Sequence, residues 1–148
     1  MRDAYTPDDP SFLAFQGGPA FDRTEREQRW HRLIDTARSR GVTVRRARVV
    51  SLPASDYIRF EHAVTDSMNI AAGESVRWLP RRQTSDLALP GNDFWLFDDR
   101  VIRFHHFAGD GSIVEDELCE DPDIIRSCRR AFEAVWARAT DHAEFKLS

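Results

Sequence analysis

The stretch from Gly91 to Phe107 contains two aromatic-rich runs of residues that a short polar segment separates. Aromatic and β-branched side chains dominate both halves of this stretch, as is typical of strands that bury one face. Asp98 and Asp99 separate the two halves, and aspartate tolerates the backbone conformations of a tight hairpin turn. The sequence therefore predicts two antiparallel strands. A further turn at 108–111 and an apolar–acidic stretch at 113–118 predict a third strand of the same meander.

Two segments space their apolar side chains three and four residues apart, which indicates amphipathic helices. The first spans 24–40, with Thr24 as the predicted N-cap and Gly41 as the stop. The second begins at Asp121 and Pro122, a favoured cap followed by a favoured first helical residue. We expect its apolar side to pack on a sheet. The predicted buried residues of this helix are Ile124, Ile125, Cys128, Phe132, Val135, Trp136 and Ala139.

The remaining elements precede the hairpin. β-Branched residues predict strands over 42–50 and 75–79, with a helix between them that is capped by Ser55 or Asp56. A strand–helix–strand order calls for a parallel pair with a right-handed crossover. We therefore expect an α/β (α+β) fold, with a single mixed sheet of about five strands, an antiparallel meander and about three flanking helices. Residues 1–20 are expected to form a flexible N-terminal arm, and residues 21–148 a single α/β domain.

The formal charge of −4 at pH 7 hides an uneven distribution along the 148 residues. Nine arginines and three acids lie between Arg23 and Arg48, whereas seven acids and no base lie between Asp110 and Asp123. Such asymmetry is compatible with a partner surface or with two solvated faces. No apolar run approaches the roughly 18 residues of a membrane span. The N-terminus lacks a signal-peptide core, and the two cysteines form no disulfide pattern, so we expect a cytoplasmic protein.

Arginines interrupt the predicted strands, where a guanidinium is costly to bury without a negative partner. Alternation places Arg46 with Arg48 on one strand face, and Arg103 with His105 on one face of a later strand. If these strands are neighbours, their side chains converge on an anion-binding cleft. The candidate residues for this cleft are Arg46, Arg48, Arg59, Arg77, Arg103 and His105. The alternative is that the arginines brace the fold through internal ion pairs with Glu61, Glu74, Asp98 or Asp99.

The chain has none of the sequence patterns that mark a catalytic or metal site. Successive residues of a strand point to opposite faces, so His105 and His106 do not serve one site. There is no HxH or HExxH spacing, no GxSxG elbow and no glycine-rich phosphate loop. We therefore expect no metal, no cofactor and no catalytic residue. Arginine clusters on either side of Trp78 leave direct nucleic-acid binding as an alternative.

Several strings of residues are similar to an actinobacterial family of unknown function, numbered 6879. These strings are DYIRFE at 56–61, AGESVRWLPR at 72–81 and GNDFWLFDD at 91–99. The similarity extends through RRARVV at 45–50 and AFEAVW at 131–136. The resemblance implies that the protein is encoded beside helix-turn-helix regulators and small companion proteins. It implies no particular reaction.

The order of elements also resembles half of a phospholipase D-like fold. That superfamily cleaves phosphodiesters with an HxK motif, but here His105 is followed by His106 and Phe107, and Lys146 is the only lysine. We therefore expect a non-catalytic regulatory or protein-interaction module that acts with a helix-turn-helix transcriptional regulator. A homodimer is a further expected assembly. The alternatives are a degenerate phospholipase D-like phosphate-ligand sensor or phosphodiesterase, and direct nucleic-acid binding through the arginine clusters.

Overall fold

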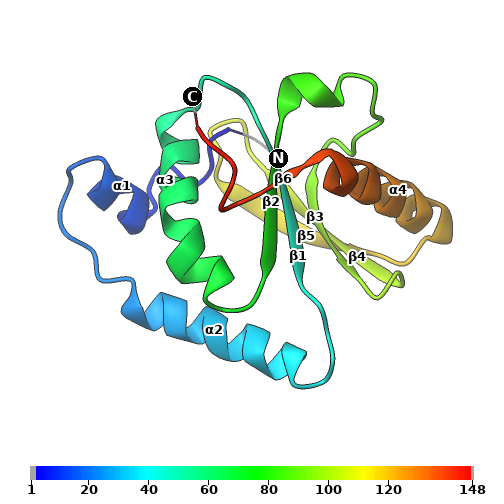
Figure 1. Cartoon of the computed structure of the whole chain (residues 1–148), viewed down its shortest axis with the longest axis horizontal. Coiled ribbons are helices and arrows are strands. Elements are labelled where there is room, and N and C mark those ends of the chain that lie inside the picture. The colour runs from blue at the N-terminus through cyan, green and yellow to red at the C-terminus, as the bar shows by residue number, and fades with distance from the viewer. Residues whose placement is uncertain (1–2, 148) are drawn as a thin grey trace.

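The computed structural model describes residues 3–147, whose strands form two separate sheets (Figure 1). Sheet A has the strand order β1-β2-β6, and sheet B has the order β3-β4-β5. The predicted α+β class is confirmed. The helices are α1 (Pro10–Phe15), α2 (Thr24–Arg38), α3 (Asp56–Thr65), the π-helical turn η1 (Asp66–Ile70), the 3₁₀ turn η2 (Arg81–Thr84) and α4 (Pro122–Arg138). The strands are β1 (Arg45–Val50), β2 (Ser75–Pro80), β3 (Asp93–Phe97), β4 (Val101–Phe107), β5 (Ile113–Cys119) and β6 (Thr140–Asp141).

The expected single mixed sheet is wrong. β1 and β3 are each an outer strand of their own sheet, and no backbone ladder joins them within residues 3–147. Side chains connect them instead, because the Arg46 guanidinium carbon on β1 lies 4.8 Å from the centre of the Trp95 ring on β3. Groups of this size hold the two strands farther apart than the roughly 4.8 Å that separates paired strands. The additional strand β6 pairs with the far side of β2.

Sheet A is built around a parallel pair, β1 and β2, connected through α3. Arg45 lies opposite Ser75 at the start of this ladder. The Ser55 side chain accepts a hydrogen bond from the Ile58 amide, so the prediction that Ser55 caps this helix is confirmed. The α3 helix and α2 lie on one side of sheet A, and α4 lies on the other (Figure 1).

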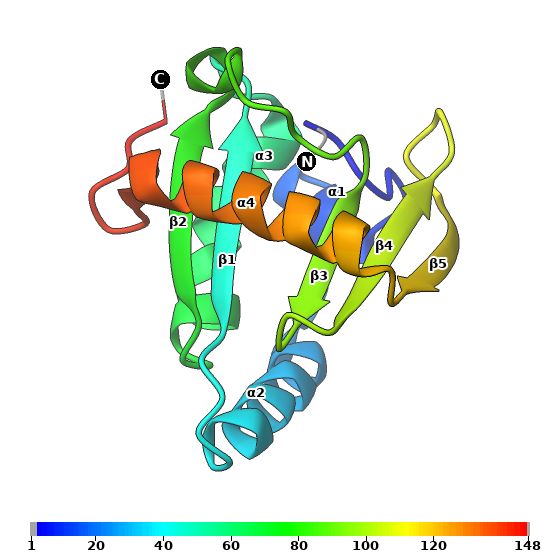
Figure 2. The ribbon, with the colours of Figure 1, turned by 90° about the vertical axis from the view of Figure 1, so that its right-hand side faces the viewer.

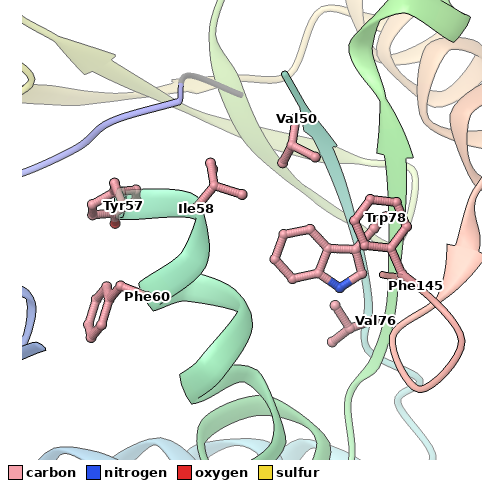
Figure 3. Close-up of a cluster of buried hydrophobic side chains, with 7 residues drawn as sticks. All are labelled: Val50, Tyr57, Ile58, Phe60, Val76, Trp78 and Phe145. Atoms are coloured by element: carbon pink, nitrogen blue, oxygen red, sulfur yellow. The ribbon is translucent and has the colours of Figure 1, made fainter. Parts of the chain in front are cut away.

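The side of sheet A that faces α3 carries an extensive hydrophobic cluster (Figure 3). Trp78 of β2 is fully buried, and its indole stacks on the ring of Phe145 at a centroid distance of 5.7 Å. Phe145 comes from the segment after β6, so the C-terminal residues complete this core. Each such large side chain stabilises the fold by roughly 1.5–3 kcal/mol on burial. The cluster consists of Val50, Tyr57, Ile58, Phe60, Val76, Trp78 and Phe145.

Helix α4 lies across both sheets and links them (Figure 2). Val135 packs with Val49 of sheet A, whereas Cys128 packs with Ile102 of sheet B. The Asp121 side chain accepts hydrogen bonds from two amides of the first turn, so the predicted cap is confirmed. The two sheets therefore share one covering helix although their strands do not pair.

Four of the seven predicted core residues of α4 are not buried. Ile124 is 41% exposed, and Phe132, Trp136 and Ala139 are only partly buried. Trp136 stacks on Phe132, and the Arg77 guanidinium carbon lies 4.6 Å from the centre of its ring. Ile124, Phe132 and Trp136 each lie one position from a buried residue, which turns them roughly 100° away from the apolar stripe. The buried residues of α4 are Ile125, Cys128, Ala131 and Val135.

Sheet B forms as predicted from the two aromatic-rich runs and the Asp98-Asp99 turn. Asp98 and Asp99 have positive φ angles of 51° and 55°, and they join β3 to β4. β4 then pairs antiparallel with β5, with an irregular register between His106 and Phe107. The meander is therefore confirmed, but as a sheet of its own.

The segment before α2 packs along the domain. Six of its residues form α1, which the sequence did not predict because this helix is short and lacks a repeated apolar spacing. The ring of Phe12 contacts those of Tyr57 and Phe60, with centroids 5.2 and 5.6 Å apart. Met1 and Arg2 of the predicted arm lie outside the described residues, as does Ser148. The flexibility of the arm stays a prediction.

Candidate functional site

A cleft of about 320 Å³ lies between the two sheets, where β1 faces β3. Helix α4 lines it through Phe132, and α3 lines it through Glu61. We call it the inter-sheet cleft. Three of the predicted anion-binding residues line it, namely Arg46, Arg48 and His105. Its volume is at the lower end of the range for small-molecule sites, which begins at roughly 300 Å³.

Arg48 projects from β1 into the wall of the cleft and is 5% exposed. Its guanidinium pairs with the Glu61 carboxylate, donates to Asn69 Oδ1 at 3.3 Å, and lies 4.9 Å from the centre of the Trp78 ring. Burial, with the charge of Arg46 adding to it, lowers the pKa of Arg48 to about 9. The group therefore stays charged at neutral pH. Its Nε has no hydrogen-bond acceptor among the described residues.

Arg46 belongs to a compact polar cluster centred on Glu74, whose side chain is fully buried. The Glu74 carboxylate accepts hydrogen bonds from Arg46 Nε at 2.7 Å, Trp30 Nε1 at 2.6 Å and Asn69 Nδ2 at 2.7 Å. The Arg46 guanidinium also contacts the rings of Trp30 and Trp95. This cluster joins α2, β1, η1 and β3. Its geometry is that of a structural junction, because the hydrogen-bonding groups of Glu74 are already engaged.

Arg103 and His105 share one carboxylate on the neighbouring strand of sheet B. Arg103 Nη2 lies 2.7 Å from Asp116 Oδ2, and His105 Nδ1 lies 2.6 Å from Asp116 Oδ1. The hydrogen bond with His105, together with the charge of Arg103, lowers the pKa of Asp116. Arg103 and Asp116 are 45% and 37% exposed, so this pair is much wetter than the Glu74 cluster.

The last two predicted residues lie away from the cleft. Arg77 pairs with Asp141 of β6 at 2.8 Å and donates to the backbone oxygen of Trp136. Arg59 is exposed on α3 and has no carboxylate partner within residues 3–147. The six candidates therefore do not gather in one place, and five of them bind carboxylates in the way that the ion-pair alternative describes.

Sequence reasoning identified some of these partners and missed others. Glu61 and Glu74 were among the proposed carboxylates, and both pair with arginines of β1. Asp116 was missed although the predicted meander already placed its strand beside that of Arg103. Asp141 lies in β6, whose pairing with β2 only the tertiary fold decides. Asn69 was missed as well, because no repeated spacing marks the η1 turn in the sequence.

Most charged groups of the inter-sheet cleft are paired with one another. Its arginines and its histidine are engaged by carboxylates. Within residues 3–147, no three side chains of His, Cys, Asp or Glu gather as metal ligands would. Over the same residues, no helix combines the length and the apolar character that crossing a membrane requires.

A second surface lies at the outer side of sheet B. Among residues 3–147, β5 pairs only with β4, and its residues Ile113 to Leu118 are all exposed. We call this strand the β5 edge, and Figure 2 shows it at the margin of the molecule. Three large apolar side chains of this strand are exposed, namely those of Ile113, Val114 and Leu118. The molecule thus offers a cleft with neutralised charges and a free strand edge.

Comparison with known proteins identifies the family. The family model described as Domain of unknown function (DUF6879) matches residues 1–147. The chain belongs to this family, which confirms the family resemblance read from its sequence strings. No curated protein and no solved structure matches the chain. The resemblance to a phospholipase D-like half therefore stays a prediction.

Proposed function

We propose that this DUF6879 protein is a non-catalytic regulatory module that acts by binding a partner protein, a helix-turn-helix transcriptional regulator. The observation that carries the proposal is the exposed β5 edge, where large apolar side chains and free backbone groups face solvent. The partner class comes from the resemblance to an actinobacterial family encoded beside such regulators. A DNA-binding partner would place the protein in the cytoplasm and connect it to nucleic acid indirectly.

The ionic contacts support a role without chemistry. Arg46 and Arg48 are already paired with Glu74 and Glu61, so an incoming phosphate would compete with these carboxylates for the two guanidinium groups. Binding through an exposed surface meets no such competition.

Co-purification with the helix-turn-helix regulator encoded beside the protein tests the proposal. Size-exclusion chromatography with light scattering should show a complex when both proteins are present at about 50 µM, well above the micromolar Kd typical of a regulatory contact. The same measurement gives the number of copies and so tests the expected homodimer. Separate elution of the two proteins at this concentration would contradict the proposal.

A phosphate-ligand sensor or degenerate phosphodiesterase is the second candidate. The observation that favours it is the acceptor-free Nε of Arg48 in the wall of the inter-sheet cleft. Calorimetric titration with inorganic phosphate tests sensing, and incubation with a chromogenic phosphodiester tests turnover. Turnover that disappears in His105→Gln would establish the enzyme and overturn the non-catalytic proposal.

Direct nucleic-acid binding is the third candidate. Exposed arginines of α2 favour it, since Arg29 and Arg32 have no carboxylate partner within the described residues. Affinity for a DNA duplex is measured over a series of salt concentrations. Each phosphate contact would contribute about −0.9 to the slope of log K against log salt. A slope near zero, or no binding at low salt, rejects this candidate.

A further inference from the structure

The β5 edge has one free side along its whole length. Its ladder with β4 runs from Ile113 to Cys119, and no second strand within residues 3–147 pairs with it. In an outer strand, alternate residues direct their amide and carbonyl groups away from the sheet. Those groups are a template on which an extended chain adds as a fourth strand of sheet B.

The side chains of this strand guard its edge by charge. Natural edges are commonly blocked by charged side chains, proline, β-bulges or a covering loop, and β5 has three consecutive acids but no lysine and no proline. Ile113, Val114 and Leu118 are 63%, 63% and 69% exposed. An edge with exposed apolar side chains at both ends gains stability when a partner covers it.

Acidic residues fill the centre of the β5 edge and select the partner. Glu115, Asp116 and Glu117 follow one another, and the segment from Asp110 to Asp123 contains seven acids and no base. Arg103, His105 and His106 of β4 pair with the second and third of these acids. The first, Glu115, has no ion-pair partner among the described residues. The edge therefore remains negatively charged.

A second copy of the chain fits this edge poorly. Antiparallel pairing of two β5 strands would bring the central acids of one copy beside those of the other, and like charges across a ladder are destabilising. A strand with lysine or arginine opposite the acids would instead be attracted to β5, because opposite charges across a ladder stabilise the pairing. Flanking apolar residues on that strand would cover Val114 and Leu118.

We propose that the β5 edge is the docking site for a basic, extended segment of a partner protein, which joins sheet B as an additional strand. This inference rests on the proposed function as a partner-binding module. It adds the surface and the chemistry of the segment that is bound. The complementary segment has basic residues at its centre and apolar residues on either side.

The test uses the full chain and a blocked pentapeptide with three central lysines between two valines. NMR amide shifts should change at β5 and its β4 neighbours, and the affinity should fall as salt rises. A peptide with three central glutamates is the matched ligand control and should cause no shift. Shifts elsewhere, equal binding of both peptides, or concentration-dependent β5 shifts of the protein alone would overturn the inference. The last result would indicate a second copy.

Charge reversal on β5 is the second part of the test. Glu115→Lys with Glu117→Lys should weaken binding of the basic peptide by at least about tenfold. The control is Glu25→Lys with Asp35→Lys, which makes the same change in net charge on exposed positions of α2. An equal loss in both variants would mean that net charge alone attracts the peptide, and would overturn docking at β5.

Binding measurements with the helix-turn-helix regulator distinguish failure of this inference from failure of the proposed function. If the wild-type protein and the β5 variant bind the regulator equally, the docking site is wrong and the partner-binding function stands. If the regulator does not bind but the basic peptide binds at β5, the assigned partner is wrong and the docking site stands.

Discussion

Sheet A holds buried ion pairs beside exposed ones, whereas the Arg103–Asp116 pair of sheet B is exposed. Sheet A is covered on both faces, and the carboxylate of Glu74 beside it is fully buried. In sheet B, α4 covers one face, and the Arg103–Asp116 pair remains in contact with water. A buried charge needs a partner of opposite charge, because an unpaired charge in the protein interior strongly destabilises the fold. Exposed pairs contribute little to stability and leave their strand free for other contacts.

The comparison assigns different roles to residues that look alike in the sequence. Arg46 and Arg103 both interrupt a strand with a guanidinium group. Arg46 joins four elements through Glu74 and two tryptophans, whereas Arg103 meets a single carboxylate at the surface. The first is a structural junction, and the second borders a surface open to a partner.

The largest effect on stability is expected when the buried carboxylate of Glu74 is removed. Glu74→Ala leaves Arg46 without its partner and deprives Trp30 and Asn69 of their acceptor. We expect the free energy of unfolding to fall by about 3 kcal/mol, measured by urea denaturation. Glu74→Gln keeps an acceptor oxygen and should lose less.

The matched change in sheet B is Asp116→Ala. Arg103 and His105 reach water when this carboxylate is absent, so the urea midpoint should hardly change. Equal losses in the Glu74 and Asp116 variants would show that the two sheets do not differ in the way we describe.

A smaller effect is expected from pH, and it should arise on the sheet A side. His142 is buried, its Nδ1 accepts a hydrogen bond from Trp78 Nε1 at 3.0 Å, and its Nε2 lies 3.3 Å from Asp66. Trp78 can only donate, so this contact requires the neutral ring. Burial, followed by the neighbouring His62, lowers the pKa of His142, against the opposing effect of Asp66.

The sign of the pH effect follows from this lowered pKa. The unfolded chain binds a proton more readily than the folded one, so stability is fully present above the usual histidine pKa of about 6.5. It should be lost as pH falls through the lower folded value. Urea midpoints between pH 7.5 and 5 measure the slope, and His142→Asn should flatten it. An unchanged slope in the variant would assign the pH response to other groups.

The smallest effect on stability is expected at the β5 edge. Ile113→Ser combined with Leu118→Ser removes two side chains that are more than 60% exposed. The free energy of unfolding, measured by thermal denaturation, should change by no more than about 0.5 kcal/mol per site, as for ordinary surface positions. A loss of several kcal/mol would mean that these residues stabilise the monomer and that β5 is part of its core.

The elements with local signals were predictable from the sequence. The Asp98-Asp99 turn, the Ser55 cap and the Asp121-Pro122 helix start each depend on residues within a few positions of one another. Hydrophobic spacing located α2 and α4 for the same reason. Thr24 was wrong as a cap, because the structure makes Arg23 the capping position, with no side-chain hydrogen bond there.

The division into two sheets could not be read from the chain, since a strand sequence does not specify its neighbour. β6 consists of two residues and becomes a strand only beside β2. The partners of the arginines were decided in the same way. Arg77 and Asp141 are 64 positions apart, and Asp99, proposed as a partner for the strand arginines, pairs with Arg129 of α4 instead.

Amino-acid order alone thus determined the Asp98-Asp99 turn, the starts of α3 and α4, the α+β class and the acidic character of 110–123. Tertiary packing alone decided which charges are buried and neutralised and which strand edge stays open. The reason is physical. Local structure follows from backbone preferences over a few residues, whereas the cost of a charge depends on how much water the whole fold leaves beside it.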